Sequence, residues 1–319
     1  MQYLRIEDEI NYSRKRYEIR RKIEDMFIDE GFVHIEPSVF ENFDKFTSLN
    51  KRAKKESMVK VISGGSDVLI LRPDITTNLI KGLIPRWQNN LKLKLFYSST
   101  IFRSNDASNV KEIRQMGVEY LGEASLKADK EVVLIALRVL KNFNDKFILE
   151  MSSSKYIHGL LKEIDVDESG KKEVKDLIYR KNRYELLNYM EGLNLSEKIY
   201  DTLANLMDLQ GSIEAVEASA RKYYLNDEME EAIAELKELN DFIVKEGYKN
   251  YVHYDLSMVT ELDYYDGLIF KGYLPNSYMA IISGGRYDSF TEVFGKKVPA
   301  IGFCIDVDEL TEIQFEEDQ

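Results

Sequence analysis

The sequence predicts an α+β fold, an antiparallel sheet flanked by helices, and three observations support this class. The segment KLKLFYSSTIFRS alternates apolar and polar residues over part of its length, as a half-buried strand does. After a polar loop at 105–111, IRQMGVEYLG has the pattern of its antiparallel return strand. Three more strand-like stretches, ELDYYDGLIFKGYL, SYMAIISGGRYD and VPAIGFCIDVDEL, follow one another near the end of the chain. Such neighbours suit an antiparallel sheet better than a wound parallel one.

The first 90 residues predict a helix, a broken strand and a strand–turn–helix unit. In the first helix, at 12–31, four apolar residues share one face: Tyr17, Ile23, Phe27 and Ile28. Gly31 supplies the stop of that helix. FVHIEPSVF then predicts a short strand broken at Pro37. VLILRPDITTNLIKGLI predicts an apolar strand, a turn and an amphipathic helix.

Residues 151–250 have a different texture and are predicted to form a helical insertion subdomain. Asp227 and Glu230 have the spacing of a capping box at the start of its last helix. One face of that helix is marked by five residues: Met229, Ile233, Leu236, Asn240 and Ile243. The insertion would separate 1–150 from 251–319, which we expect to form the main domain together.

Composition excludes several classes of protein. The chain has 319 residues, 44% of them hydrophobic, and no apolar run approaches the roughly 18 residues of a membrane helix. The charged N-terminus argues against a secretory signal, so we expect a cytoplasmic protein that does not enter a membrane. Three scattered histidines and the single Cys304 give little support for a metal site. The net charge of −12 disfavours binding to tRNA or another polyanion.

Four stretches, far apart in sequence, carry candidate site residues. In LRPDITT, Asp74 and Thr76 could accept the hydrogens of an ammonium group, although Asp74 alone is better explained as a helix cap. In FRS, Arg103 leaves a strand on the core side and would need an anionic partner. In IRQMGVEYLG, Gln115 and Glu119 are four apart on one face of a strand.

Glycines accompany these candidates at two places, Gly117 in IRQMGVEYLG and the pair Gly284 and Gly285 in SGGRYD. Gly117, between Gln115 and Glu119, leaves room for an approach to the sheet. The alternative for Glu119 is a structural ion pair, with Arg103 as its partner. The fourth stretch joins YYDGLIF and SGGRYD, where Tyr264 and Tyr265 would point to opposite faces of a strand.

Together these residues describe a small pocket for a zwitterion. Asp74 and Thr76 would hold an ammonium group. Arg103 and the side-chain amide of Gln115 would hold a carboxylate. Glu119 and Tyr264 could hold the two nitrogens of an imidazole, because a neutral imidazole has one donor and one acceptor nitrogen.

The order LRPDITT, FRSN, IRQMGVEYLG, ELDYYDGLIF, SGGRYD and PAIGFCIDVDEL resembles the catalytic domain of class II histidyl-tRNA synthetases. It is more similar still to their paralogues, the regulatory subunits of ATP phosphoribosyltransferase. The resemblance runs from about Gly31 to Leu310 and leaves 151–250 without a matched motif. It implies a six- to seven-stranded antiparallel sheet and a homodimer with Pro37 at its interface. It also implies a set of histidine-binding positions: Asp74, Thr76, Gln115, Arg103, Glu119, Tyr264 and Tyr265.

The sequence departs from the synthetase pattern where ATP would bind. The second motif would place Glu at Asn105, and a phosphate-binding arginine would stand at Thr260. The third motif would end in GLER, but here it is DVDE, so Asp306 replaces a glycine and Glu309 replaces an arginine. Two lost cations and a repulsive carboxylate make ATP activation implausible. The chain also ends where the resemblance would place an anticodon-binding domain, so we expect none.

These departures favour a histidine-sensing regulatory subunit with no catalytic residue, metal or cofactor of its own. The resemblance implies that it partners a short-form ATP phosphoribosyltransferase catalytic subunit, with L-histidine as the effector, in the first step of histidine biosynthesis. One alternative is a divergent histidyl-tRNA synthetase-like enzyme that forms an aminoacyl-adenylate or transfers an amino acid to an acceptor other than tRNA. Another alternative is a nucleic-acid-binding module on the same fold.

Overall fold

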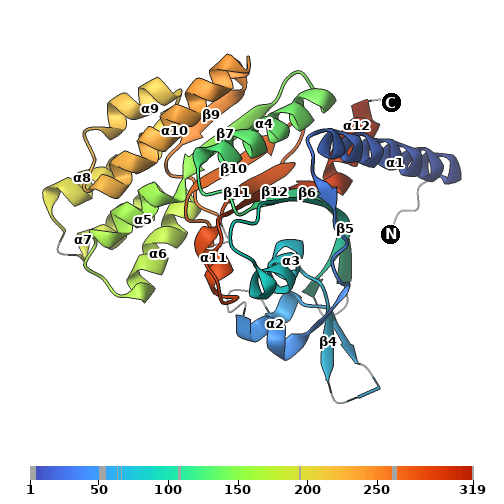
Figure 1. The fold of residues 1–319 in the computed structure, drawn as a ribbon. Coiled ribbons are helices and arrows are strands. Elements are labelled where there is room, and N and C mark those ends of the chain that lie inside the picture. Colours follow the sequence, from blue (N-terminus) through green and yellow to red (C-terminus); the bar gives the residue numbers. More distant parts are fainter. Residues whose placement is uncertain are drawn as a thin grey trace.

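A computed structural model describes residues 5–49, 55–62, 64–65, 67–106, 109–193, 195–260 and 264–317. Its centre is a nine-stranded sheet, and helices pack on both of its faces (Figure 1). The strands lie in the order β1 (Val33–His34), β5 (Leu93–Asp106), β6 (Asn109–Leu121), β12 (Ala300–Asp306), β11 (Ile282–Arg286), β10 (Leu268–Tyr273), β7 (Ile148–Ser153), β9 (Val252–Asp255) and β8 (Gln210–Gly211). The predicted α+β class is confirmed.

The six strands from β5 to β7 pair antiparallel throughout, as the sequence predicted. The pair β5 and β6 forms a long hairpin, with Tyr97 opposite Gly117 and Leu95 opposite Glu119. The expected six to seven strands fall short of the nine observed. The extra strands are short and lie toward the edges, where β1 pairs parallel with β5 and β9 pairs parallel with β7.

One face of the sheet is covered by α1 (Ile6–Asp29), α4 (Leu126–Phe143) and α12 (Val307–Glu317) (Figure 1). In α1 the buried face consists of Ile19, Ile23 and Phe27. The prediction was right for the last two but wrong for Tyr17 and Ile28, which are 63% and 56% exposed. Residues four apart keep one helical face, whereas these two fall beside it. Gly31 ends the helical segment with φ +80°, as expected of its stop.

Residues 154–245 are mostly helical, as predicted: α5 (Ser154–Lys162), α6 (Glu168–Tyr179), α7 (Arg183–Glu191), α8 (Glu197–Asn205), α9 (Ile213–Ala220) and α10 (Asp227–Lys245). All five residues of the predicted α10 face are buried. The predicted cap is off by one residue, because Asn226 accepts a hydrogen bond from the backbone N–H of Met229 at 3.2 Å.

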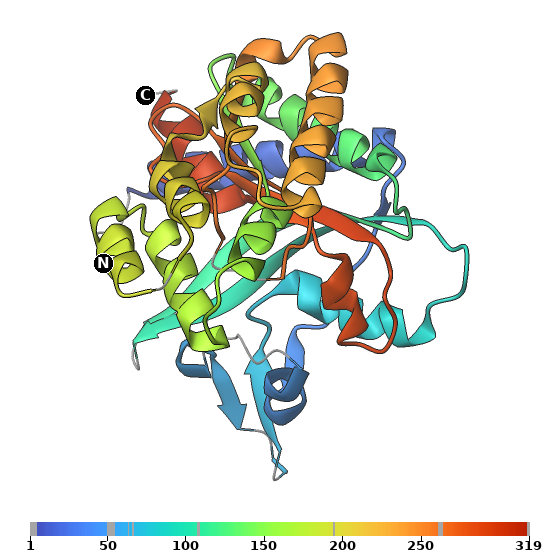
Figure 2. The same ribbon diagram turned by 90° about the vertical axis from the view of Figure 1, so that its left-hand side faces the viewer.

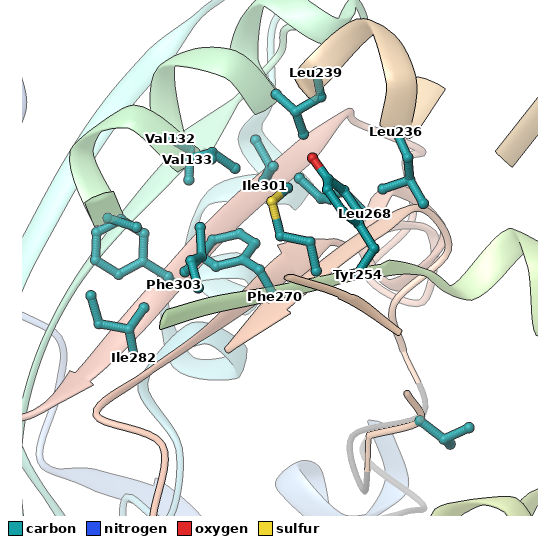
Figure 3. Close-up of a cluster of buried hydrophobic side chains, with 14 of the residues drawn as sticks. Val132, Val133, Leu236, Leu239, Tyr254, Leu268, Phe270, Ile282, Ile301 and Phe303 are labelled. Carbon is teal, nitrogen blue, oxygen red and sulfur yellow. The ribbon is translucent and has the colours of Figure 1, made fainter. Parts of the chain in front are cut away.

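These helices share a hydrophobic core with the sheet. Figure 3 shows Leu236 and Leu239 of α10 packed above Leu268 and Ile301 of the sheet. The division into a main domain and an insertion subdomain at 151–250 stays a prediction.

The opposite face of the sheet carries α3 (Ile75–Leu83) and α11 (Asp288–Glu292). A three-stranded sheet of β2 (Phe40–Asn42), β4 (Val68–Leu71) and β3 (Lys60–Ile62) projects beyond them, with α2 (Phe43–Leu49) beside it (Figure 2). The predicted strand, turn and helix of VLILRPDITTNLIKGLI correspond to β4 and α3. In the described part of the chain, no helix is both long and apolar enough to cross a membrane.

Candidate functional site

The candidate site lies on the sheet face beneath α3 and α11, and the strand register fixes its floor. Glu119 of β6 pairs with Gly302 of β12, which in turn pairs with Gly285 of β11. Residues paired across neighbouring strands project from the same face, so this row places one carboxylate beside two glycines. Because the two glycines have no side chains, the longer side chains around them can extend over the centre of the floor.

Glu119 is the chemical centre of this floor. Its side chain is 2% exposed, and Thr76 donates a hydrogen bond to Oε1 at 2.7 Å. The Tyr287 hydroxyl donates to Oε2. Burial raises the pKa of the Glu119 carboxyl to about 7, although both hydroxyl donors pull that pKa down. Glu119 is therefore able to exchange a proton near neutral pH.

Neighbouring side chains occupy the space above the glycines of the floor. A Cβ on Gly117 would come within 2.4 Å of the Tyr97 hydroxyl, and one on Gly285 within 2.7 Å of the Tyr265 ring. A Cβ on Gly302 would meet Glu119 Oε2. The room predicted above Gly117 is thus taken by Tyr97, a residue that the sequence argument did not consider.

Asp74 and Thr76 stand at the N-terminus of α3. Asp74 is the N-cap, and its Oδ2 accepts from the backbone N–H of Thr77 at 2.9 Å. The simpler interpretation of Asp74, a helix cap, is therefore correct for one of its oxygens. The same cap orients α3 so that Thr76, two residues on, reaches Glu119. Asp74 also lies close enough to raise the pKa of Glu119.

Arg103 and Gln115 occupy the outer part of the floor. Arg103 is exposed, and its Nε donates to the carbonyl of Pro73 at 3.4 Å. Arg103 projects from the same face of β5 as Tyr97, as predicted, but it lies beyond the core. The alternative ion pair with Glu119 was wrong, because the partners of Glu119 are two hydroxyls. Gln115 is paired with Asp306 of β12 and shares the face of Glu119, as its spacing predicted.

The two consecutive tyrosines differ from their prediction. They precede β10 rather than lie within it, and the rings of Tyr264 and Tyr265 contact each other with centroids 4.7 Å apart. Tyr264 also stacks on Phe290 of α11 at 4.8 Å. Side chains of residues outside a strand need not alternate between the two faces of the sheet, so the rings of Tyr264 and Tyr265 can lie side by side. Tyr287 completes this aromatic wall.

The motif SGGRYD contains Tyr287, for which no role at the site was predicted. Its hydroxyl is the second donor to Glu119, and its side chain is 2% exposed. A buried tyrosine hydroxyl usually needs a partner, and this residue directly follows a strand whose glycines were already singled out. A tyrosine directly after this glycine-containing strand was therefore the feature from which a role for Tyr287 could have been predicted.

The acidic junction between β12 and α12 is engaged in local structure. Asp306 Oδ1 accepts from the backbone N–H of Glu309 at 3.0 Å, and Glu309 Oε1 accepts from the Ser277 hydroxyl at 3.0 Å. Asp308 binds Arg114, through the backbone N–H at 2.9 Å and Nη1 at 3.3 Å. Burial raises the pKa of the Asp306 carboxyl. The carboxylates of this junction therefore accept hydrogen bonds that stabilise the fold.

Parts of the sequence motifs lie outside the described residues. These are Leu262 and Asp263 of LDYY and the side chain of Asn105. Thr260, at the position predicted for a lost arginine, borders a small cavity together with Tyr265. Among the residues that the structure describes, no three histidine, cysteine, aspartate or glutamate side chains gather in a way that could hold a metal ion.

Comparison with known proteins places this geometry in a family. The family model for histidyl-tRNA synthetase matches residues 10–310. ATP phosphoribosyltransferase regulatory subunits from Bacillus mycoides (strain KBAB4) and Bacillus cereus (strain G9842) are 32% and 31% identical, over 92% of this chain and 70% of each relative.

Solved structures agree with these sequence matches. An ATP phosphoribosyltransferase regulatory subunit/histidyl-tRNA synthetase from Bacillus halodurans C is similar with a TM-score of 0.84 and 25% identity, over 94% of this chain and 79% of that one. A chain of the ATP phosphoribosyl transferase (HisG:HisZ) complex from Thermotoga maritima has the same fold, with a TM-score of 0.70 and 19% identity over 92% of this chain and 97% of that one. The chain therefore belongs to the histidyl-tRNA synthetase family and, within it, to the regulatory subunits of ATP phosphoribosyltransferase.

Proposed function

We propose that this chain is a regulatory, non-catalytic subunit of ATP phosphoribosyltransferase that senses free L-histidine. Its partner would be a short-form catalytic subunit, which carries out the first step of histidine biosynthesis. The observation that carries the proposal is the acidic junction after β12. Asp306 and Glu309 stand where the synthetase motif has a glycine and a phosphate-binding arginine, and both carboxylates are held by local hydrogen bonds. A triphosphate at this place would meet negative charge.

The amino-acid part of the site supports the sensing role. Asp74 and Thr76 would accept from the ammonium group, and Arg103 with Gln115 would donate to the carboxylate. The imidazole would lie between Glu119 and the tyrosines at 264 and 265, and it would replace one of the hydroxyl partners that Glu119 has in this structure. A carboxyl that titrates near neutral pH suits a ligand whose own pKa is about 6.5.

Histidine would regulate the complex by binding one of its conformations better than another, because a ligand shifts an equilibrium only through differential affinity. We infer a cytoplasmic homodimer within a hetero-oligomer, with Pro37 near the dimer contact. No interaction with tRNA is part of this proposal, since the net charge is −12.

The test compares two assays on the purified chain. Calorimetry should detect L-histidine binding that is weakened by Arg103→Ala and by Glu119→Ala. The same protein should catalyse no histidine-dependent exchange of pyrophosphate into ATP. Robust exchange would instead support the enzyme alternative, in which the chain forms an aminoacyl-adenylate. Unchanged histidine inhibition of the reconstituted complex in both variants would remove the pocket from the sensing role.

A further inference from the structure

A cavity of about 250 Å³, separate from the candidate site around Glu119, lies on the opposite face of the sheet. It is enclosed by α4, α10, the N-terminus of α5 and the segments around Asp266 and Asp288. Leucines form its apolar wall, and Figure 3 shows three of them, Leu236, Leu239 and Leu268, in one hydrophobic cluster. The volume suits a molecule the size of a free amino acid.

The polar wall of the cavity carries both signs of charge. Three basic and four acidic side chains line it: Lys155, Arg286, Lys297, Asp129, Glu235, Asp266 and Asp288. Arg286 and Asp129 neutralise each other in a buried pair, with Nε donating to Oδ1 at 3.0 Å. Lys155 holds one oxygen of Glu235 at 2.6 Å. Asp266 accepts from the backbone N–H groups of Asp288 at 3.0 Å and Ser289 at 2.6 Å, so the wall combines hydrogen-bonded groups of both signs.

Ser153 adds an unused hydroxyl to this wall. Its side chain is 1% exposed, and its Oγ has no hydrogen-bond partner, which is costly for a buried polar group. Ser153 is paired with Leu268 across β7 and β10, and both line the cavity, so the register sets the Ser153 side chain on the cavity side of the sheet. Ser153 is also the N-cap of α5, but its side chain makes no capping hydrogen bond. Ser153 and the N-terminus of α5 thus border the same cavity.

We propose that this cavity binds a free α-amino acid as its zwitterion. The carboxylate would lie against the Ser153 hydroxyl, Lys155 and the N-terminus of α5, where the helix dipole favours negative charge. The ammonium group would lie against Asp266 and Glu235. The leucines would hold the side chain.

Other ligand classes fit this lining less well. Inorganic phosphate would meet four carboxylates in the wall. A metal ion would need a cluster of ligands that the described residues do not provide. A purely apolar ligand would leave the Ser153 hydroxyl without a partner. A zwitterion would instead provide an opposite charge for both the basic and the acidic side chains and an acceptor for the Ser153 hydroxyl.

Calorimetric titration of the full chain with each of the standard L-amino acids tests this proposal. At least one should bind saturably at millimolar concentration. Its decarboxylated and deaminated analogues, which each carry a single charge, should bind at least tenfold more weakly, because a hydrogen bond to a charged group contributes about 1.5–3 kcal/mol. Equal binding of a single-charge analogue, or no saturable binding of any amino acid, would overturn the proposal.

Ser152 offers a matched control for Ser153. It is the preceding residue of β7, equally buried and also without a partner for its hydroxyl, but it projects from the other face and does not line the cavity. Ser153→Ala and Lys155→Met should each weaken binding about tenfold, whereas Ser152→Ala should not. Urea unfolding would verify that all three variants fold.

Binding in the Glu119 pocket has a different signature. Thr76→Val alters that pocket and leaves the second cavity untouched, so the zwitterion should bind this variant normally. An amino acid whose binding is lost in Thr76→Val but kept in Ser153→Ala occupies the first pocket, and it would count against the second site. This outcome bears only on the inference and leaves the sensing role proposed above intact.

Discussion

Glu119→Gln tests whether the buried carboxyl beneath α3 carries a proton in the folded protein near neutral pH. Burial raises its pKa from the ordinary value of 4.5 to about 7, while hydrogen bonds from Tyr287 and Thr76 oppose that rise. Glutamine has the same shape as the protonated acid and cannot titrate. The comparison of the two proteins therefore isolates the proton at one site.

The sign of the effect follows from proton linkage. Between pH 4.5 and 7 the folded state binds more protons at Glu119 than the unfolded state does, so the free energy of unfolding falls as pH rises. The contribution is fully present below the unfolded pKa and is lost as pH rises through about 7. A pKa change of this size corresponds to a loss of about 3 kcal/mol between pH 4.5 and 8. The free energy of unfolding of Glu119→Gln should not show this fall.

Urea unfolding at a series of pH values, analysed by linear extrapolation, gives the free energy of each protein. The difference between the wild type and Glu119→Gln should grow with pH in favour of the variant. Thr76→Val supplies an independent check, because it removes a donor that lowers the pKa of Glu119, so the fall should move to higher pH. A difference that is flat with pH, or that favours the wild type at pH 8, would refute the reasoning.

Three further substitutions test packing in the sheet and in the helices beside it. Gly302→Ala should destabilise the fold by about 1–3 kcal/mol in urea unfolding, because its Cβ would meet Glu119 Oε2 and a backbone oxygen 2.3 Å away. Gly82→Ala, on an exposed turn of α3 with open space around it, should instead stabilise by about 0.5–1 kcal/mol, and a loss similar to that of Gly302→Ala would contradict this account. Asp129→Asn should cost about 3–5 kcal/mol, since it leaves the Arg286 charge buried with a weakened partner. A cost below 1 kcal/mol would mean that solvent reaches this pair.

The fold was predictable where a pattern repeated along the chain. The hairpin of β5 and β6 and the buried face of α10 follow from periods of two and of about 3.6 residues, which the sequence displays directly. The edge strand β8 was not predictable, because it has two residues and forms only by pairing with a longer neighbour, whereas the equally short β1 lies within the predicted strand FVHIEPSVF. The cap of α10 was misplaced by one residue because Asn226 and Asp227 are both good capping residues.

One contact between candidate site residues could be predicted from the sequence, but most of their hydrogen-bond partners could not. Thr76 and Glu119 were placed in one pocket, and the structure joins them by a hydrogen bond. Arg103 was expected to face inward because an arginine at the end of an apolar strand usually has an anion nearby, yet its strand extends past the core and leaves it exposed. Tyr287 and Tyr97 reach the site across the sheet, and such contacts depend on strand register, which one sequence does not reveal.

We proposed that the acidic junction at the end of β12 does not bind ATP, and its hydrogen bonds show how carboxylates can stand there without loss of the fold. A glycine and an arginine at 306 and 309 would contribute little to holding α12, because neither has an oxygen acceptor in its side chain. Asp306 caps this helix through the backbone N–H of Glu309, and Glu309 fixes the Ser277 hydroxyl of a neighbouring loop. Each carboxylate therefore stabilises the junction while it repels phosphate. If the chain has no need to bind ATP, both effects favour the acidic residues, which accounts for their presence where the synthetase motif has a glycine and an arginine.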